Sequence, residues 1–280
     1  MPRMQPPPGW LRGSEVSARL HISDSLLSRY VEEGKIRRHV PQGRTYGFYN
    51  EDDVKILENV NSAFPGAKPS QKHRSFFSIA KRSDVSAIAK IDHDAIHPND
   101  DAYNEEVFLN WQEKNPETLF ALRDINGVIV GFVSILPLTR PALDSIIRGK
   151  VSLTGVTDKD IPLFTKNAII HLYIVAMATD PQYPIKMRHE YGAALLTGLF
   201  SFMLDLADRS VAIETITARS HTQDGIKLMR KLGLPWLISP VADMELFSAV
   251  VTESGIPFLR KYSAKLAEKR SLPNKAKNIP

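Results

Sequence analysis

Residues 13–57 read GSEVSARLHISDSLLSRYVEEGKIRRHVPQGRTYGFYNEDDVKIL, and their apolar pattern predicts two short helices joined by a turn. Val16 and Leu20 lie four residues apart, which places them on one face of the first helix. The second helix has its own apolar stripe, formed by Leu26, Leu27, Tyr30 and Val31. Two helices of this length separated by a turn predict a helix-turn-helix unit.

Polar residues and a glycine mark the ends of these helices. We expect Ser14 and Ser23 to be N-caps, because a serine hydroxyl can accept a hydrogen bond from a backbone N–H that the helix leaves unpaired. Gly34 stands at the position where glycine commonly ends a helix. The boundaries therefore agree with the apolar pattern.

A cluster of basic residues follows the second helix, with a tight turn at Gln42-Gly43 inside it. The cluster comprises Lys35, Arg37, Arg38 and Arg44. Basic side chains beside a helix-turn-helix are suited to phosphate contact, which dominates the affinity of proteins for nucleic acid. The pattern favours double-stranded DNA as a partner. The alternative is a three-helix protein-interaction module with a solvated, charged loop.

The segment from Ile22 to Ile36 resembles the recognition-helix signature of MerR-like and excisionase-like winged helix-turn-helix domains. Gly43–Tyr46 resembles the wing of that family, and Asn50–Val54 resembles the start of its next helix. The resemblance implies that the second helix reads the major groove, while the wing holds phosphates or enters the adjacent minor groove. The residues predicted to bind DNA are Ser25, Ser28, Arg29, Arg37, Arg38, Arg44 and Tyr46.

Composition limits the classes of protein to which the chain can belong. The 280 residues are 43% hydrophobic and 24% charged, which is typical of a soluble globular protein. There is no cysteine, so disulfides, thiolate zinc sites and cysteine nucleophiles are excluded. Residues 1–9 contain no apolar signal segment, and 193–206 is too short to span a bilayer. We expect a cytoplasmic protein of bacterial style with no membrane partner.

Charge and proline content divide the chain into regions. Residues 61–82 hold five Lys or Arg and no Asp or Glu, and residues 259–280 hold seven against one. Prolines and a glycine between these basic residues predict a linker after the first domain. The predicted organisation is a DNA-binding domain at 1–60, a basic linker at 61–74, a second domain at 75–258 and a basic C-terminal tail at 259–280.

The sequence pattern of the second domain predicts the element order β-α-α-β-β-β-α-β-α-β. This order mixes hairpins with crossovers, as α+β and mixed α/β folds do. Asn126-Gly127 predicts a tight hairpin between strands at 118–123 and 128–136. A long irregular segment is expected over 137–166. The other strands are expected at 76–80, 169–179, 212–218 and 245–251, and the helices at 84–97, 104–113, 193–207 and 224–232.

That order resembles the GNAT acetyltransferase fold over roughly residues 74–255, a mixed α/β fold with a central twisted sheet. Phe120–Val133 resembles its second and third strands, His171–Ala178 its central strand, and Ile226–Leu234 a later helix. The resemblance implies that main-chain groups bind acetyl-CoA or a related acyl-CoA, with the helix from Gly192 facing the pyrophosphate. The predicted cofactor-binding residues are Val175, Ala176, Met177, Arg188, His189, Gly192 and Ala193.

The chain departs from the GNAT pattern at two positions. Glu190 stands where a glycine of the phosphate loop is expected, and Met229 where the family commonly has a tyrosine that protonates the departing thiolate. Tyr183 or Tyr191 could supply that donor instead. Acetyl transfer also needs a base. The predicted catalytic residues are Glu190 and Asp180, with Glu214 and His171 as further candidates.

Each catalytic candidate also has a structural interpretation. Asp180 precedes Pro181 and suits a turn, Glu190 matches the positive end of a helix dipole, and Glu214 and His171 could face outward from strands. His93 and His97 form an i,i+4 pair beside two aspartates. No third ligand is spaced to join them, so we predict no metal site.

These features predict a DNA-binding transcriptional regulator whose GNAT-like domain binds an acyl-CoA, as a sensor or a weak N-acetyltransferase. Two alternatives stay open. One is an active N-acetyltransferase targeted by its helix-turn-helix domain. The other is a non-enzymatic, DNA-bound adaptor of plasmid or phage maintenance with a decayed GNAT fold.

A homodimer is a further expectation. The linker at 61–74 contains prolines in the place where MerR relatives have a dimerisation helix, so a dimer should form through the second domain or through 256–266. The alternative for 256–266 is a helix that docks on its own domain.

Overall fold

The computed structural model describes residues 5–42, 44–64, 75–97 and 104–271 of the chain. They divide into two compact units, Met1–Ser62 and Ala63–Pro280, and each unit has its own hydrophobic core. Most of the predicted linker, residues 65–74, lies outside the described residues. None of the helices described is long and apolar enough to cross a membrane.

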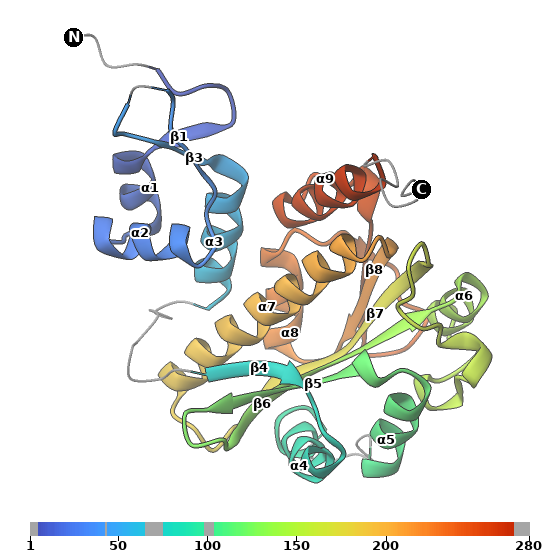
Figure 1. Cartoon of the computed structure of the whole chain (residues 1–280). Helices are drawn as coiled ribbons and strands as arrows, with labels where there is room; N and C mark the ends of the chain where they lie inside the picture. Colours follow the sequence, from blue (N-terminus) through green and yellow to red (C-terminus); the bar gives the residue numbers. More distant parts are fainter. Residues whose placement is uncertain (1–4, 43, 65–74, 98–103, 272–280) are drawn as a thin grey trace, which may run out of the picture. The chain divides into compact units, whose positions relative to one another are not determined.

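The first unit is a small helical domain with a three-stranded antiparallel sheet (Figure 1). Its helices are α1 (Gly13–Leu20), α2 (Asp24–Glu32) and α3 (Glu51–Ala63). Its strands, in sheet order, are β1 (Trp10–Arg12), β3 (Phe48–Asn50) and β2 (Arg38–His39). The predicted helix-turn-helix and the hairpin that follows it are confirmed. The core comprises Val16, Leu20, Leu27, Tyr30, Ile36 and Val54.

Two of the three predicted helix boundaries hold in the first unit. The Ser23 hydroxyl accepts from the Leu26 backbone N–H at 3.3 Å, and Gly34 follows α2 with a φ of +68°, a conformation that glycine adopts without strain. Ser14 is not an N-cap. Helix α1 begins at Gly13, and its first turn is closed instead by Glu15, whose carboxylate accepts from the Arg12 N–H at 2.6 Å.

The second unit is built on one seven-stranded mixed sheet. In sheet order its strands are β4 (Ser75–Ile79), β5 (Leu119–Asp124), β6 (Ile129–Leu138), β7 (Ile169–Thr179), β8 (Ala212–Ser220), β10 (Glu245–Val250) and β9 (Trp236–Leu237). Every neighbouring pair is antiparallel except β7 and β8, which are parallel. The predicted mixed α/β architecture is confirmed, as is the tight turn before Gly127, whose φ is +81°.

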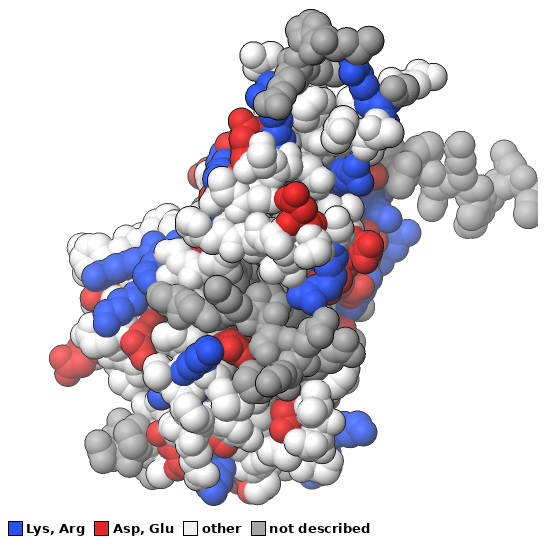
Figure 2. All heavy atoms as spheres, turned by 90° about the vertical axis from the view of Figure 1, so that its left-hand side faces the viewer, with Lys and Arg blue, Asp and Glu red and all other residues white. Residues whose placement is uncertain are grey.

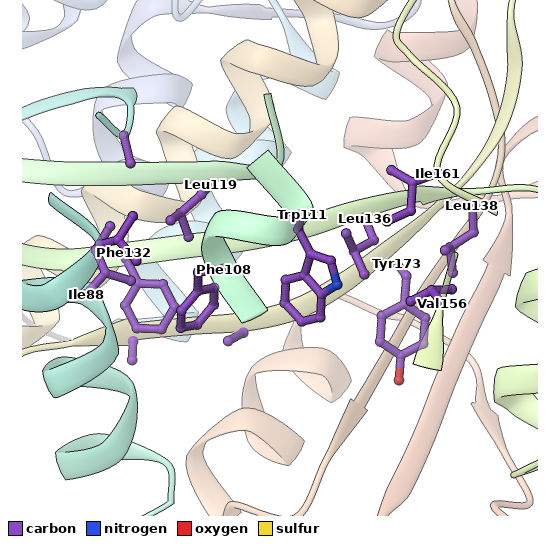
Figure 3. Close-up of a cluster of buried hydrophobic side chains, with 14 of the residues drawn as sticks. Ile88, Phe108, Trp111, Leu119, Phe132, Leu136, Leu138, Val156, Ile161 and Tyr173 are labelled. Atoms are coloured by element: carbon purple, nitrogen blue, oxygen red, sulfur yellow. The ribbon is translucent and has the colours of Figure 1, made fainter. Parts of the chain in front are cut away.

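Helices cover both faces of this sheet (Figure 1). On one face lie α4 (Val85–Ala95), α5 (Glu105–Lys114) and α6 (Arg140–Ile147), whose apolar side chains pack with β6 and β7. Figure 3 shows Phe108 and Trp111 of α5 packed beside Phe132 and Leu136 of β6. On the other face lies α7 (Ile185–Asp208), with α9 (Pro257–Ser271) against it, while α8 (Gln223–Lys231) packs on β8.

The helices of the second unit differ from the sequence prediction in two places. The segment 137–166, expected to be irregular, contains α6, because Pro141 suits a first helical turn and Leu143 and Ile146 share a buried face. Helix α7 begins at Ile185 rather than near residue 193. Residues 186–190 are mostly polar, which concealed a helical spacing in which Tyr191 and Leu195 are both buried.

The predicted basic tail at 259–280 is wrong over its first half. Residues 257–271 form α9, in which Phe258, Leu259 and Tyr262 are buried against the second unit. The Phe258 ring stacks on Phe200 of α7 with 3.9 Å between ring centroids. The basic residues Lys265 and Lys269 form ion pairs with Asp208 at the end of α7. The segment is therefore the docked helix that the sequence offered as an alternative.

Candidate functional site

The parallel strands β7 and β8 separate at their carboxyl ends. Their last paired residues are Ile174 and Ala218, yet β7 continues to Thr179 and β8 to Ser220. On its other edge β7 stays paired with β6 as far as Thr179. The main chain of β7 from Val175 onward is therefore available on the side that faces β8. We call this separation the strand opening.

A β-bulge lies at the start of the strand opening. Ser134 of β6 pairs with Ala176, whereas the next residue, Ile135, pairs with Ile174. Val175 is thus an extra residue on β7, which bends the strand and turns its following residues. The bulge changes the direction of β7 at the point where its pairing with β8 ends.

A cavity of about 650 Å³ occupies the strand opening. Its walls include β7 from Tyr173 to Thr179, the end of β8, the first two turns of α7 and one face of α8. Six of the seven residues predicted to bind a cofactor line it; Ala193 is the exception among the described residues. The six are Val175, Ala176, Met177, Arg188, His189 and Gly192.

The beginning of α7 supplies the cavity with backbone donors, although not from the residue that we predicted. Because α7 starts at Ile185, the N–H of Gly192 lies inside the helix and is not a terminal donor. The terminal N–H groups are those of Ile185, Lys186 and Met187, since Arg188 N already donates to Pro184 O at 3.0 Å. Of these three residues, Ile185 belongs to the described lining of the cavity. An exposed helix N-terminus of this kind attracts an anion.

Two arginines add unsatisfied donors to the cavity walls. The Nε atoms of Arg188 and Arg219 are buried and have no hydrogen-bond partner within the described part of the chain. Arg219 is held in place through Nη2, which donates to the carbonyl oxygens of Ile146 at 3.2 Å and Ile147 at 3.1 Å. A bound anion would satisfy donors that the described residues leave unpaired.

The residues considered as proton donors lie in different places. Met229 of α8 lines the cavity and cannot donate a proton. Tyr183 and Tyr191 pack edge to face, 5.5 Å between centroids, and neither belongs to the described cavity lining. Tyr173, which the sequence did not single out, does line the cavity, and burial raises the pKa of its hydroxyl. In the sequence, Tyr173 stands within an apolar strand, and nothing in that pattern marks its hydroxyl as a cavity group.

The four residues considered as bases do not meet in the cavity. Neither Asp180 nor Glu190 belongs to its described lining. The Asp180 carboxylate accepts from the Gln182 backbone N–H at 2.9 Å, as expected for a turn residue. His171 does not face outward: it is buried, its Nδ1 lies 2.9 Å from the Thr215 hydroxyl, and its Nε2 lies 3.3 Å from Glu214. Burial lowers the pKa of His171.

The two histidines of α4 and its C-terminal end have unlike surroundings. His93 lies at the surface with its Nδ1 3.0 Å from Asp94. His97 lines the cavity, and its Nδ1 lies 3.1 Å from the fully buried carboxylate of Asp92. No group of three His, Cys, Asp or Glu residues that could hold a metal ion occurs among the described residues. The sequence spacing alone gave no sign that His97 lies in the cavity.

The first unit places its predicted DNA-binding residues on two elements. On α2, Ser25 and Ser28 are exposed, and Arg29 is partly covered, with its Nε 3.5 Å from Glu33. In the loop between β2 and β3, Arg44 is exposed and Tyr46 has 84% of its surface exposed. These side chains are accessible to a partner.

Arg37 and Arg38 are engaged within the first unit itself. The Arg37 guanidinium bonds the buried Asp53 carboxylate at 2.9 Å and the Asn50 side chain at 2.9 Å. Arg38 Nη2 donates to Thr45 O at 3.1 Å, and its side chain lies so close to Gly47 that a Cβ there would come within 2.5 Å of Arg38 Nε. Acidic side chains are interspersed among the basic ones on the face in Figure 2.

Comparisons with known proteins agree with this division. Residues 11–64 match the family model described as MerR HTH family regulatory protein. No curated protein matches the chain at a significant level. The first unit is thus a MerR-type helix-turn-helix domain.

Among solved structures, the chain is similar to the ribosomal-protein-S18-alanine N-acetyltransferase from Escherichia coli, at 16% identity and TM-score 0.40, over 65% of this chain and 97% of that one. It is similar to the mosquito arylalkylamine N-acetyltransferase like 5b, at 13% and 0.43, over 63% and 100%. It is also similar to the NatC complex bound to Gag peptide and CoA, at 11% and 0.39, over 62% and 96%. The assignment of a GNAT-like fold rests on the strand order and the strand opening rather than on these scores.

Proposed function

We propose that the chain is a cytoplasmic, DNA-binding transcriptional regulator whose second unit binds acetyl-CoA or a related acyl-CoA, as a sensor or a weak N-acetyltransferase. The observation that carries the proposal is the strand opening, which combines free main-chain groups of β7 with a cavity of about 650 Å³ and a helix N-terminus. That volume lies within the range of small-molecule and cofactor sites.

Two parts of an acyl-CoA, the pantetheine arm and the pyrophosphate, have matching groups at the cavity. The amides of a pantetheine arm can pair with the main chain of β7 beyond Val175, as an added strand would. The pyrophosphate can accept from the terminal N–H group of Ile185, which lines the cavity, and Arg188 offers its unpaired Nε. Most of these contacts use backbone atoms, so they depend little on side-chain identity.

Met229 favours binding over rapid turnover. A thiolate leaves more easily when a positioned acid protonates it, and general acid–base help is typically worth about a hundred- to ten-thousand-fold in rate. The α8 side chain in the cavity wall is a thioether, which gives no such help. A protein that binds an acyl-CoA and turns it over slowly is suited to report its concentration.

The first unit supplies the DNA-binding half of the proposal. Ser25, in the first turn of α2, and Ser28, one turn later, are exposed on the helix that would reach base edges in a helix-turn-helix. Arg44 and Tyr46 are exposed beyond it, at a distance along the chain that suits a wing. Phosphate contact by the wing would make binding fall with salt.

Titration calorimetry of acetyl-CoA into the full chain tests the ligand. We expect binding in the parent and in Arg82→Gln, an exposed arginine outside the cavity, and weaker binding in Arg188→Gln. Absence of binding in the parent would leave the non-enzymatic adaptor as the better interpretation. Fast thiol release with a panel of amines would instead favour the active N-acetyltransferase.

Fluorescence anisotropy with a mixed-sequence DNA duplex tests the other half. The parent should bind, with an affinity that falls steeply as salt rises, and Arg44→Ala should bind more weakly with a shallower salt dependence. A parent protein that leaves the duplex unbound even at low salt would exclude the regulator.

A further inference from the structure

We propose that Arg219 of β8 binds a carboxylate of the substrate at the strand opening. The inference rests on the proposed function, because it requires an acyl-CoA in the cavity that Arg219 lines. It names a chemical class for the group beyond the thioester sulfur. That group carries a carboxylate, which belongs either to the acyl chain or to the molecule that accepts the acyl chain.

Arg219 stands at the edge of the strand opening. The last residues that pair between β7 and β8 are Ile174 and Ala218, so Arg219 is the first residue of β8 beyond that pairing. On the other edge of β8, Arg219 pairs with Leu246 of β10, which fixes its backbone. The side chain therefore starts from a defined point, where the two parallel strands separate.

Arg219 and the start of α7 lie on opposite faces of the sheet. Arg219 Nη2 donates to the carbonyl oxygens of Ile146 at 3.2 Å and Ile147 at 3.1 Å, in the last turn of α6. Helix α6 covers one face and α7 the other (Figure 1). Both Arg219 and Ile185, at the start of α7, line the same cavity. A CoA thioester whose pyrophosphate lies at Ile185 therefore directs its acyl end through the strand opening, toward Arg219.

The contacts of Arg219 leave its positive charge without a counter-ion in the described part of the chain. A guanidinium has five N–H donors, and the two hydrogen bonds to α6 engage only Nη2. Both acceptors are carbonyl oxygens, which carry partial rather than full negative charge. Nε is buried and has no hydrogen-bond partner among the described residues. A charged group that is removed from water is costly to leave unpaired, so a bound anion would stabilise this arrangement.

The cavity wall beside Arg219, as far as it is described, offers no carboxylate to take that role. The wall includes the segment that follows α6 and the segment that precedes β10. Its residues in the described lining are Gly149, Val151, Ser152, Leu153, Val241 and Met244. A Cβ on Gly149 would lie 3.6 Å from Val241 Cγ2, so the two segments meet. The acidic residue of the described lining, Asp224, stands in the first turn of α8.

Tyr173 offers a second donor on the same face of the sheet. In the parallel pairing of β7 with β8 it lies opposite Thr217, two residues before Arg219, so the three side chains leave the sheet on one face. Figure 3 shows Tyr173 among the buried side chains that pack on that face. Burial raises the pKa of its hydroxyl, and the charge of Arg219 lowers it by less. The phenol is therefore neutral near pH 7 and can donate to a ligand in the cavity that both residues line.

A carboxylate matches Arg219 in shape and in charge. The planar guanidinium presents pairs of N–H groups that fit the two oxygens of a carboxylate, and such charged hydrogen bonds are stronger than neutral ones. Phosphate also fits a guanidinium, but the pyrophosphate of the proposed ligand lies at the start of α7, on the other face. Acyl chains and amine acceptors most often carry negative charge as a carboxylate.

Calorimetry with two thioesters of equal chain length tests the acyl chain as the source. Succinyl-CoA ends in a carboxylate, whereas butyryl-CoA ends in a methyl group. If the acyl chain is the source, the protein should bind succinyl-CoA about tenfold to a hundredfold more tightly, because a hydrogen bond to a charged group contributes that much to affinity. Arg219→Gln should remove this preference and bind butyryl-CoA as the parent does.

A second calorimetric experiment tests the acceptor as the source. Coenzyme A is bound first, and the common amino acids are titrated into the complex, each beside the amine that lacks its carboxylate. If the acceptor is the source, at least one amino acid should bind about tenfold to a hundredfold more tightly than its matched amine. Arg219→Gln should make the two affinities equal, at unchanged affinity for coenzyme A.

Arg148→Gln is the matched control in both experiments. Arg148 is exposed at the end of α6 and lies outside the described cavity lining, so this variant should keep the preference of the parent. The comparison of matched ligands in the parent needs no variant. It therefore tests the inference even if Arg219→Gln loosens α6 from β8.

The outcomes separate this inference from the function on which it rests. A preference that Arg219→Gln abolishes and Arg148→Gln keeps supports the inference and identifies the source of the carboxylate. CoA binding without a preference in either experiment overturns the inference and leaves the proposed function. A preference that survives in Arg219→Gln also overturns it. A parent that binds neither coenzyme A nor its thioesters overturns the proposed function itself.

Discussion

At the scale of single residues, the side chain of Arg37 shows a conflict between two uses. Its position in a basic cluster predicts phosphate contact, whereas its guanidinium bonds the Asp53 carboxylate, which is 0% exposed. The sequence could not show this contact, because the two residues are sixteen positions apart. They come together because β2, which follows Arg37, pairs with β3, and β3 leads directly into α3.

Arg37→Ala should therefore destabilise the first unit by about 1–3 kcal/mol, because it removes a charged hydrogen-bond donor from a buried carboxylate. Calorimetric unfolding measures the change, and Arg44→Ala, at an exposed position, should stay within about 0.5 kcal/mol of the parent. If Arg37→Ala unfolds like the parent yet loses DNA affinity, Arg37 acts on DNA directly.

Tyr262 gives a prediction about pH. Its hydroxyl donates to Val211 O at 2.7 Å and accepts from Ile213 N at 2.8 Å, and burial raises its pKa to about 12. The unfolded pKa is about 10, so the neutral phenol stabilises the fold fully below pH about 10, and this contribution is lost as pH rises through about 12.

We expect the melting temperature of the second unit to fall more steeply between these pH values in the parent than in Tyr262→Phe. At neutral pH the variant should be less stable by about 1–3 kcal/mol, because two buried main-chain groups lose their partner. Equal pH dependence in the two proteins would show that another group titrates in this range.

At the scale of elements, the start of α7 is the helix boundary whose misprediction most affects the proposed ligand site. The glycine pattern predicts that the helix begins at Gly192 and offers its N–H groups there, whereas the terminal N–H groups of α7 are those of Ile185, Lys186 and Met187. Helix start signals are weak here, because Pro184 at the N-cap position offers no side-chain oxygen to accept from the first turn. Six of the seven strands of the large sheet, with their apolar runs and the Asn126-Gly127 turn, were predicted to within a few residues, whereas the two-residue strand β9 was not predicted.

Ile185→Pro should weaken acetyl-CoA binding by about tenfold while leaving the fold intact. Proline is tolerated at the first helical position, so the change removes one N–H from the site and little else. Ile185→Ala is the matched control, since it removes the exposed side chain and keeps the N–H. Calorimetry on both variants gives the comparison, and equal affinities would exclude this N–H as a ligand-binding group.

At the scale of the whole molecule, the two units have separate cores, one of six buried residues around Leu27 and one spread over the large sheet. The order of the domains was predictable, because an amphipathic helix-turn-helix and a β-rich region have different periods. The sequence did not predict that Asp92, His97 and His221 lie close together. Residues 97 and 221 meet only because the chain returns to the cavity after a parallel crossover.

Scanning calorimetry of the full chain should then show two unfolding transitions. Acetyl-CoA at a hundred times its dissociation constant should stabilise only the larger transition, by about 2.7 kcal/mol, because a ligand stabilises the part that binds it. Mixed-sequence DNA should raise only the other transition. A single transition raised by both ligands would contradict the independence of the units.

The docking of α9 also bears on how the protein is made. Val211 and Ile213 belong to the middle of the chain, yet the hydroxyl that pairs with them arrives with residue 262. During synthesis the ribosome releases every strand of the large sheet before α9 emerges. A polypeptide halted before residue 257 leaves those two groups without that partner and Phe200 without its stacked ring. Nascent chains of the second unit should therefore stay open to chaperones and proteases until α9 has emerged.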